Sequence, residues 1–219
     1  MDVINFILNP KSDFLGHTLA YLQICGISIV GAVIIGILLG AAVSGNAILA
    51  FIAVNLSGLI RAIPVIATLI IFVPFFGFGL KPSLIALILL GIPPVLLNTY
   101  TGIRGVDPAM IDAAKGMGMT TWQIASKIQA PLVTPLVAAG VRTTAVQIVA
   151  TATLAAFVGA GGYGDYIVDG ISVFNNTELI AGSLAVAAVA IIIEVFMGWL
   201  QHKLTPVGIR TEDVEPLKA

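Results

Sequence analysis

The feature that most constrains this chain is a series of five apolar stretches, each long enough to cross a membrane. A helix needs roughly 20 apolar residues to span the hydrocarbon core of a bilayer. The stretches cover residues 20–43, 48–76, 83–103, 132–158 and 178–200. Hydrophobic residues make up 58% of the 219 residues and charged residues only 10%, which excludes an ordinary soluble globular domain. Long apolar runs without alternation favour helices over a barrel, so we expect an all-α membrane protein with five transmembrane helices in a single domain, residues 1–219.

The second apolar stretch is too long for one upright crossing, and it contains Pro64. Proline removes a backbone donor and kinks a helix. This stretch therefore predicts a tilted or kinked helix, or an interfacial segment that leads into one.

The distribution of basic residues predicts the orientation, because cytoplasmic loops of membrane proteins carry an excess of lysine and arginine. Seven basic residues lie between the third and fourth stretches, at their edges or in the C-terminal tail: Arg104, Lys115, Lys127, Arg142, Lys203, Arg210 and Lys218. The other side would hold only Lys11 and Lys81. We therefore expect the N-terminus outside the cell and the C-terminus in the cytoplasm. A net charge of -1 gives no indication of a nucleic-acid partner.

The first stretch carries a small residue at every fourth position, which predicts a flat ridge on one helix face. The ridge consists of Ser28, Ala32, Gly36, Gly40 and Ser44. Small residues let helix backbones approach closely in a membrane. We expect this ridge to pack inside the subunit, with a contact between two subunits as the alternative.

The main hydrophilic connection, residues about 104–131, predicts a hairpin of two short helices. Asp107 can cap the first helix, Pro108 suits its first turn, and Gly118 suits the left-handed residue that ends it. Thr120 and Gln123 form a capping box for the second helix, which we expect Pro131 to end. The small residues Ala113, Ala114, Gly116 and Gly118 would let a partner come close to the backbone.

The same connection resembles the "EAA" loop of permeases from binding-protein-dependent ABC importers, whose pattern is Glu-Ala-Ala-x3-Gly-x9-Ile-x-Leu-Pro. The matching residues are Asp112, Ala113, Ala114, Gly118, Ile128 and Pro131. Two positions depart from the pattern, with Asp112 in place of Glu and Ala130 in place of Leu. The resemblance implies the type I ABC importer permease fold and a coupling helix that sits in a cleft of a cytoplasmic ATPase. It assigns the contact to Asp112, Ala113, Ala114 and Gly118, and we add Gly116, Ile128 and Pro131 as candidates.

Residues 98–103, 106–109 and 151–165 look like the osmoprotectant branch of that family, which takes up glycine betaine, carnitine or choline. This resemblance implies a bacterial inner-membrane permease that pairs with a second copy or a related permease and receives solute from an external binding protein. ATP and Mg would bind to the ATPase, so we expect no cofactor in this chain and no enzymatic activity. An importer for another amino-acid-like solute remains an alternative.

Other functions find less support in the residues themselves. A secondary transporter or channel would normally show buried ion-coupling carboxylates or two repeated halves, and neither is evident. A membrane enzyme would need a cluster of titratable groups. The lone Cys25 and the distant His17 and His202 lack metal-ligand spacing, and no Gly-x4-Gly-Lys motif is present.

Ionisable groups at membrane depth are the default candidates for a transport pathway, which here means Arg61 and Glu194. Either side chain could instead reach the headgroups, Glu194 from near the cytoplasmic end of its helix. Threonines along the fourth stretch are expected to bond back to their own helix. The candidate pathway or gate residues are Arg61, Pro64, Asn98, Tyr100, Gly159, Gly161 and Gly162. The three glycines also fit Gly-x-Gly-x-x-Gly, but they follow an apolar helix, so we interpret them as a sharp turn and not a nucleotide site.

The aromatic residues do not predict a binding cage for a quaternary ammonium ion, which needs several rings around the cation. Phe72, Phe75, Phe76 and Phe78 gather near the outer end of the second stretch, where packing or interfacial anchoring accounts for them. We therefore expect a separate external protein to hold the high-affinity cage.

Overall fold

The computed structural model describes residues 3–9 and 12–205, and every regular element in these ranges is a helix. The ten α-helices are α1 (Val3–Ile7), α2 (Phe14–Ser44), α3 (Ala47–Ala62), α4 (Val65–Phe76), α5 (Leu80–Arg104), α6 (Pro108–Gly116), α7 (Thr121–Ile124), α8 (Ala130–Ala152), α9 (Tyr163–Ser172) and α10 (Asn176–Leu204). A π-helical turn, Ala125–Gln129, joins α7 to α8, and a 3-10 turn, Thr153–Val158, follows α8. The predicted all-α class is confirmed. Three of the basic residues used to predict the orientation lie outside the described residues: Lys11, Arg210 and Lys218.

Four helices in the described ranges are long and apolar enough to cross a membrane: α2, α5, the continuous rod from Thr121 to Val158 that contains α8, and α10. The pair α3 and α4 supplies a fifth crossing if its two halves count as one span. The two halves meet at an angle of 95°. Five apolar stretches in the sequence therefore correspond to four continuous helices and one bent pair.

The break between α3 and α4 lies where Pro64 predicts a kink. Ile63 and Pro64 have extended backbones, with ψ angles of 128° and 134°, so the helical ladder stops at Ala62 and begins again at Val65. With 16 residues, α3 is about 24 Å long, shorter than the hydrocarbon core of about 30 Å. The prediction of a kinked helix is confirmed.

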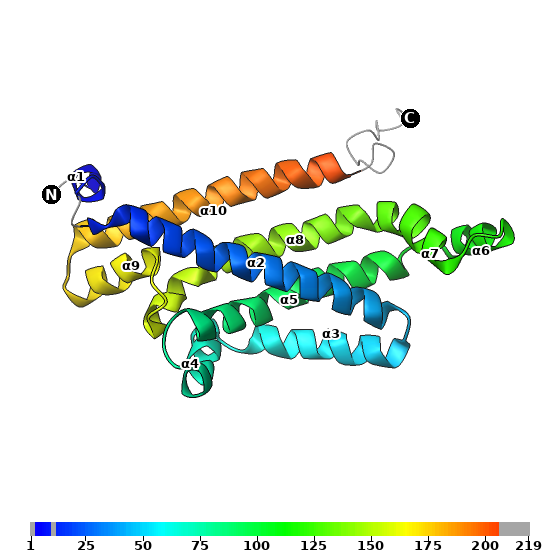
Figure 1. The fold of residues 1–219 in the computed structure, drawn as a ribbon, viewed down its shortest axis with the longest axis horizontal. Helices are drawn as coiled ribbons and strands as arrows, with labels where there is room; N and C mark the ends of the chain where they lie inside the picture. The colour runs from blue at the N-terminus through cyan, green and yellow to red at the C-terminus, as the bar shows by residue number, and fades with distance from the viewer. Residues whose placement is uncertain (1–2, 10–11, 206–219) are drawn as a thin grey trace, which may run out of the picture.

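The centre of the bundle is α5, which packs against α2 on one side and α8 on another (Figure 1). The small-residue ridge of α2 makes the first of these contacts possible. Ser28 and Ala32 are fully buried, and a Cβ added to Gly36 would lie 2.7 Å from the Cβ of Val95 on α5. A Cβ added to Gly40 would lie equally close to the Leu96 carbonyl oxygen. The ridge packs inside the subunit, as predicted.

The long helices run parallel to the longest axis of the molecule and define two ends (Figure 1). One end holds α6, α7, the turn between α2 and α3, and the C-terminal end of α10, and we call it the hairpin end. The opposite end holds α1, α4 and α9, and we call it the α9 end.

Candidate functional site

The first helix of the hairpin, α6, begins and ends as its sequence predicts. The Asp107 carboxylate accepts a hydrogen bond of 2.8 Å from the Ala109 backbone N–H, and Pro108 occupies the first turn. Gly118 has a φ of 78°, a left-handed conformation that glycine adopts without strain. The Met119 N–H then donates to the Ala114 carbonyl oxygen at 3.1 Å, which satisfies a terminal group of α6.

The second helix of the hairpin begins at the predicted capping box but does not end at Pro131. Gln123 Oε1 accepts from the Thr120 N–H at 2.8 Å, and Thr120 Oγ1 accepts from the Gln123 N–H at 3.3 Å. The chain then continues through the π-helical turn into α8, with Pro131 in the first turn of that helix. The prediction that Pro131 closes the helix is wrong, because a π-helical turn precedes the proline and the helical rod runs on from Thr121 to Val158.

The hairpin presents most of its predicted coupling residues to its surroundings. Asp112, Ala113, Gly116 and Gly118 are all exposed. A Cβ added to Gly116 or Gly118 would meet no atom within 4 Å, so this face can accept a close neighbour.

Ala114 differs from the other predicted coupling residues because its side chain is fully buried inside the hairpin. It therefore packs α6 against its own chain and offers a partner no side-chain contact. Ile128 and Pro131 lie further along, on the π-helical turn and at the start of α8. Asp112 pairs with Lys115 at 3.3 Å on the surface, where such a pair contributes little stability.

The sequence patterns did not single out three large apolar side chains on the hairpin. Met110, Met117 and Trp122 are 46%, 73% and 79% exposed. Exposed apolar groups outside the membrane span are typical of protein interfaces, and tryptophan is enriched among residues that dominate binding. The signal was present in the sequence, since these are large apolar residues in its main hydrophilic connection.

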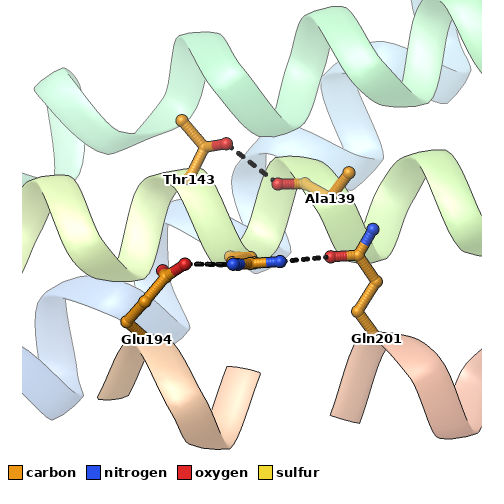
Figure 2. Close-up of polar contacts among 5 residues, drawn as sticks. Ala139, Thr143, Glu194 and Gln201 are labelled. Carbon is orange, nitrogen blue, oxygen red and sulfur yellow. Dashed lines mark hydrogen bonds and ion pairs between the residues drawn. The ribbon is translucent and has the colours of Figure 1, made fainter. Parts of the chain in front are cut away.

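A second cluster lies within the membrane-spanning bundle, where Arg142 of α8 meets two side chains of α10 (Figure 2). Arg142 Nε donates to Glu194 Oε1 at 3.0 Å, and its Nη2 donates to the same oxygen. Its Nη1 donates to Gln201 Oε1 at 3.4 Å. Figure 2 shows Glu194 and Gln201 on either side of the guanidinium group.

The depth of this cluster corrects two expectations. Arg142 lies twelve residues past Ala130, about 18 Å along α8, so it is not a loop charge that reports orientation. Glu194 lies ten residues before Leu204, about 15 Å from the end of α10, and it pairs with Arg142 instead of reaching the headgroups. Sequence patterns missed this pair because its members are 52 positions apart.

The remaining pathway candidates do not converge. Arg61 is exposed at the end of α3, and Pro64 begins α4. Asn98 Nδ2 donates to the Pro94 carbonyl oxygen of its own helix at 2.8 Å, and Tyr100 is half-buried two residues further along.

The threonines of α8 follow the predicted pattern with one exception. Thr143 and Thr151 donate to carbonyl oxygens four residues earlier, at 3.0 and 2.8 Å. Thr144 instead donates across to the Gly91 carbonyl oxygen of α5 at 2.8 Å. That bond ties together two of the central helices.

The glycine-rich segment at the α9 end forms the predicted turn. Gly159, Gly161 and Gly162 have φ angles of 72°, 82° and 89°. The turn is held against α2, because His17 Nδ1 donates to the Gly162 carbonyl oxygen at 3.0 Å. A Cβ added to Gly164 would lie 2.1 Å from the Thr153 carbonyl oxygen, so α9 also packs directly on the 3-10 turn.

An aromatic cluster that the sequence did not reveal secures α9. Tyr163 and Tyr166 contact Phe14 with ring centroids 5.5 and 6.0 Å apart, and Tyr166 also contacts Phe6 and His17. The two tyrosines are only 4% and 3% exposed, and burial raises the pKa of Tyr166 to about 12. These rings fill a core and leave no open cage.

The phenylalanines of the second stretch divide into one that packs inside the molecule and two that are largely exposed. Phe72 packs beside Leu69 and Val158, while Phe75 and Phe78 are 78% and 77% exposed. Among the residues that the structure describes, no three His, Cys, Asp or Glu side chains lie close enough to hold a metal ion.

Four spanning helices, a broken fifth span and an exposed helical hairpin define an all-α membrane protein. The chain belongs to the family of binding-protein-dependent transport system inner membrane components, which matches residues 32–206. It is therefore a multi-pass inner-membrane permease subunit of an ABC importer.

Relatives cover almost the whole chain. Over 208 residues it is 33% identical to the glycine betaine/carnitine/choline transport system permease protein OpuCB of Bacillus subtilis, a match that covers 95% of this chain and 96% of that protein. The carnitine transport permease protein OpuCB of Listeria monocytogenes is 31% identical, with 95% of each chain covered. The osmoprotectant import permease protein OsmW of Salmonella typhimurium is 32% identical over 215 residues, covering 96% of this chain and all of that protein.

Solved structures share the fold. The MetNI methionine ABC transporter in an inward-facing conformation contains a chain that aligns with a TM-score of 0.79 at 20% identity, covering 88% of this chain and 96% of that one. An amino acid ABC transporter crystallised with histidines aligns with a TM-score of 0.70 at 15% identity, covering 94% and 98%. The expected type I importer permease fold is confirmed.

Proposed function

We propose that this permease imports a small osmoprotectant such as glycine betaine, carnitine or choline. The observation that carries the proposal is the near full-length identity of 31–33% to permeases named for glycine betaine/carnitine/choline, carnitine or osmoprotectant import. The binding protein outside the membrane supplies the high-affinity site, because the described part of the permease has no open group of aromatic rings that could enclose the cation.

The ATPase docks on the hairpin. Its contact face consists of Asp112, Ala113, Gly116 and Gly118, flanked by Met117 and Trp122. This face combines space for close approach with exposed apolar anchors, which suits a protein interface. ATP and Mg belong to that partner.

The connection between the hairpin and the bundle suits the transmission of movement. The rod Thr121–Val158 includes the second hairpin helix, the π-helical turn and α8, so the hairpin continues directly into a spanning helix. When the ATPase dimer closes and displaces the hairpin, α8 moves with it. The solute pathway then opens alternately to each side, and a second copy or a related permease supplies the other half of that pathway.

The hairpin end faces the cytoplasm and the N-terminus lies outside. Arg104, Lys115, Lys127 and Lys203 lie toward the hairpin end, whereas Asp165 and Asp169 lie on α9 at the other end. Reporter fusions after Lys115 and at the C-terminus should read as cytoplasmic. An external signal from either fusion contradicts this orientation.

The substrate assignment is tested by reconstituting the permease with its ATPase and binding protein in liposomes that contain ATP. We expect saturable uptake of labelled glycine betaine, carnitine or choline that stops when ATP is withheld. Uptake of an amino acid such as methionine, with no uptake of the three osmoprotectants, would instead make the permease an amino-acid importer. Micromolar or tighter solute binding to permease and ATPase alone would contradict the division of labour with the binding protein.

A further inference from the structure

The Arg142–Glu194 pair has no evident purpose in stability. A charged side chain near the middle of a bilayer is costly even when it is paired, and apolar residues of similar size often replace buried ion pairs without loss. Gly198 of α10 faces the Arg142 guanidinium at ordinary van der Waals distance, since a Cβ added to it would lie 3.6 Å from the guanidinium carbon, so the Arg142 side chain itself fills this part of the seam. An uncharged side chain of similar length could fill the same space without the cost of two charges.

The pair lines one of two grooves on opposite sides of the α8–α10 seam. One groove, of about 340 Å³, is lined mainly by apolar side chains such as Val137, Val141 and Leu200. The other, of about 590 Å³, is a more open depression lined by Arg142, Thr143, Gln147, Glu194 and Gln201 together with the apolar Ala139, Val146 and Ala150, and Gln201 borders both grooves. We call the second one the polar groove. Polar side chains at this depth normally face a water-filled cavity or other protein, because lipid offers them no hydrogen bonds.

The ion pair leaves both charges accessible from the polar groove. The Arg142 and Glu194 side chains remain 39% and 42% exposed. Both hydrogen bonds from the guanidinium to Glu194 end on the same oxygen, Oε1, and within the described residues Oε2 accepts no hydrogen bond. A solute in the groove can therefore approach either member of the pair.

The charges of the pair complement those of a zwitterion. A carboxylate can take a two-pronged hydrogen bond from the Arg142 guanidinium, and a quaternary ammonium ion, which donates no hydrogen bond, needs only a nearby negative charge such as that of Glu194. If a zwitterion enters between the two side chains, the sum of charges at this depth stays zero. A simple cation can pair only with the Glu194 carboxylate, and it leaves the Arg142 guanidinium without a negatively charged partner.

We propose that the polar groove is a passage site for a zwitterionic solute, in which the solute's carboxylate replaces Glu194 on Arg142 while Glu194 faces the solute's cationic end. This inference rests on the proposed function for its solute class, glycine betaine and carnitine. In the empty groove, Glu194 acts as an internal substitute for the solute carboxylate, which keeps Arg142 paired between transport events.

The first test asks whether water and solute reach the polar groove. Thr143→Cys introduces a thiol beside Arg142, and Ile192→Cys places one at similar depth on the opposite, apolar face of α10, where Ile192 is 65% exposed. The native Cys25 is buried, so the unmodified protein gives the background. The reagent is a membrane-impermeant methanethiosulfonate with a trimethylammonium group, applied to the full complex in liposomes.

We expect the thiol at position 143 to react at least about tenfold faster than that at position 192, because only a thiolate in contact with water reacts readily. Glycine betaine supplied with the binding protein should slow the reaction at position 143 by about threefold or more, and choline should slow it less. A thiol at position 143 that is unreactive, or that no transported solute protects, overturns the proposal.

The second test separates recognition from a structural tether. The double substitution Arg142→Gln and Glu194→Gln removes both charges and keeps polar side chains that can pair. We expect assembly with the ATPase to persist and glycine betaine uptake to fall at least about tenfold relative to choline uptake. An unchanged ratio of the two uptakes shows a tether and overturns the proposal.

The two proposals fail in different ways. If the unmodified complex transports neither glycine betaine nor choline but an amino acid it does transport protects the thiol at position 143, the passage site stands and the osmoprotectant assignment falls. If the complex transports glycine betaine and that solute leaves the thiol unprotected, the osmoprotectant assignment stands and the passage site falls.

Discussion

Glycines of the hairpin and glycines of α9 differ in their surroundings. At the hairpin end, a Cβ added to Gly116 or Gly118 would meet nothing within 4 Å. At the α9 end, a Cβ added to Gly164 would lie 2.1 Å from the carbonyl oxygen of Thr153. Gly116 and Gly118 leave space that a partner can fill, whereas Gly164 allows the chain to pack against itself.

The difference shows what a small residue can and cannot reveal. Glycine in an apolar protein marks a place where something comes close, but the sequence does not say whether that neighbour is in the same chain. At the α9 end the neighbours are the aromatic rings of α2 and α9 and the backbone of the 3-10 turn. At the hairpin end, Gly116 and Gly118 have no such neighbour among the described residues.

The largest effect should come from Gly116→Asp, which adds a charge to the open hairpin face. Gly116 is exposed within α6, so the substitution leaves the permease fold intact, while a buried charge at the interface excludes the ATPase. Uptake by the reconstituted complex should fall by about 100-fold or more. Gly116→Ala is the control and should keep most of the uptake. Normal uptake by the aspartate variant would place the ATPase elsewhere.

Substitutions at the α9 end should instead change the stability of the permease fold. Gly164→Ala forces a methyl group against the Thr153 carbonyl oxygen, which should lower the free energy of unfolding by about 1–3 kcal/mol. Gly159→Ala is the matched control, because that position has a φ of 72° but open space, and it should lose about 1 kcal/mol from backbone strain alone. Thermal unfolding in detergent measures both. Equal losses would mean that the α9 packing is looser than described.

Trp122→Ala should weaken the contact with the ATPase without affecting the permease itself. The side chain is 79% exposed, so its removal leaves no cavity in the permease. Affinity for the ATPase, measured in lipid nanodiscs, should fall about tenfold. The second tryptophan, Trp199, is 54% exposed on α10 and serves as the control, whose replacement by alanine should leave this affinity unchanged. Equal effects of the two substitutions would remove Trp122 from the interface.

The smallest effect should come from Asp165→Asn on α9. Burial raises the pKa of the Asp165 carboxyl, His17 at 3.6 Å lowers it, and Asp169 raises it again. Because the net shift is upward, this group stabilises the fold below its unfolded pKa of about 3.9 and loses that contribution as the pH rises through its folded value. The variant should therefore be slightly more stable at neutral pH, by less than about 1 kcal/mol, since the Asp165 side chain is 30% exposed and solvent screens the effect.

Thermal unfolding of both proteins between pH 4 and 7 measures this difference, which should shrink as the pH falls. A loss of stability at neutral pH would show that the pair with His17 dominates instead.

The sequence predicted those parts of the molecule that depend on neighbouring residues. The caps at Asp107 and at Thr120 form within three positions of their partners, so local pattern was sufficient. The ion pair of Arg142 with Glu194 requires two helices to meet, and no local pattern encodes that meeting. Pro131 was misplaced for a related reason, since whether a proline ends a helix or begins one depends on the turn before it.

The most direct test of this account compares Gly116→Asp with Gly164→Ala in one preparation, by measuring thermal stability and the stimulation of ATP hydrolysis by solute-loaded binding protein. The account predicts that Gly116→Asp unfolds at the temperature of the unmodified permease but shows no stimulated hydrolysis. It predicts that Gly164→Ala unfolds at a lower temperature yet, while folded, still supports stimulated hydrolysis. Full stimulation in the Gly116→Asp complex would contradict the claim that the open face of the hairpin belongs to the ATPase.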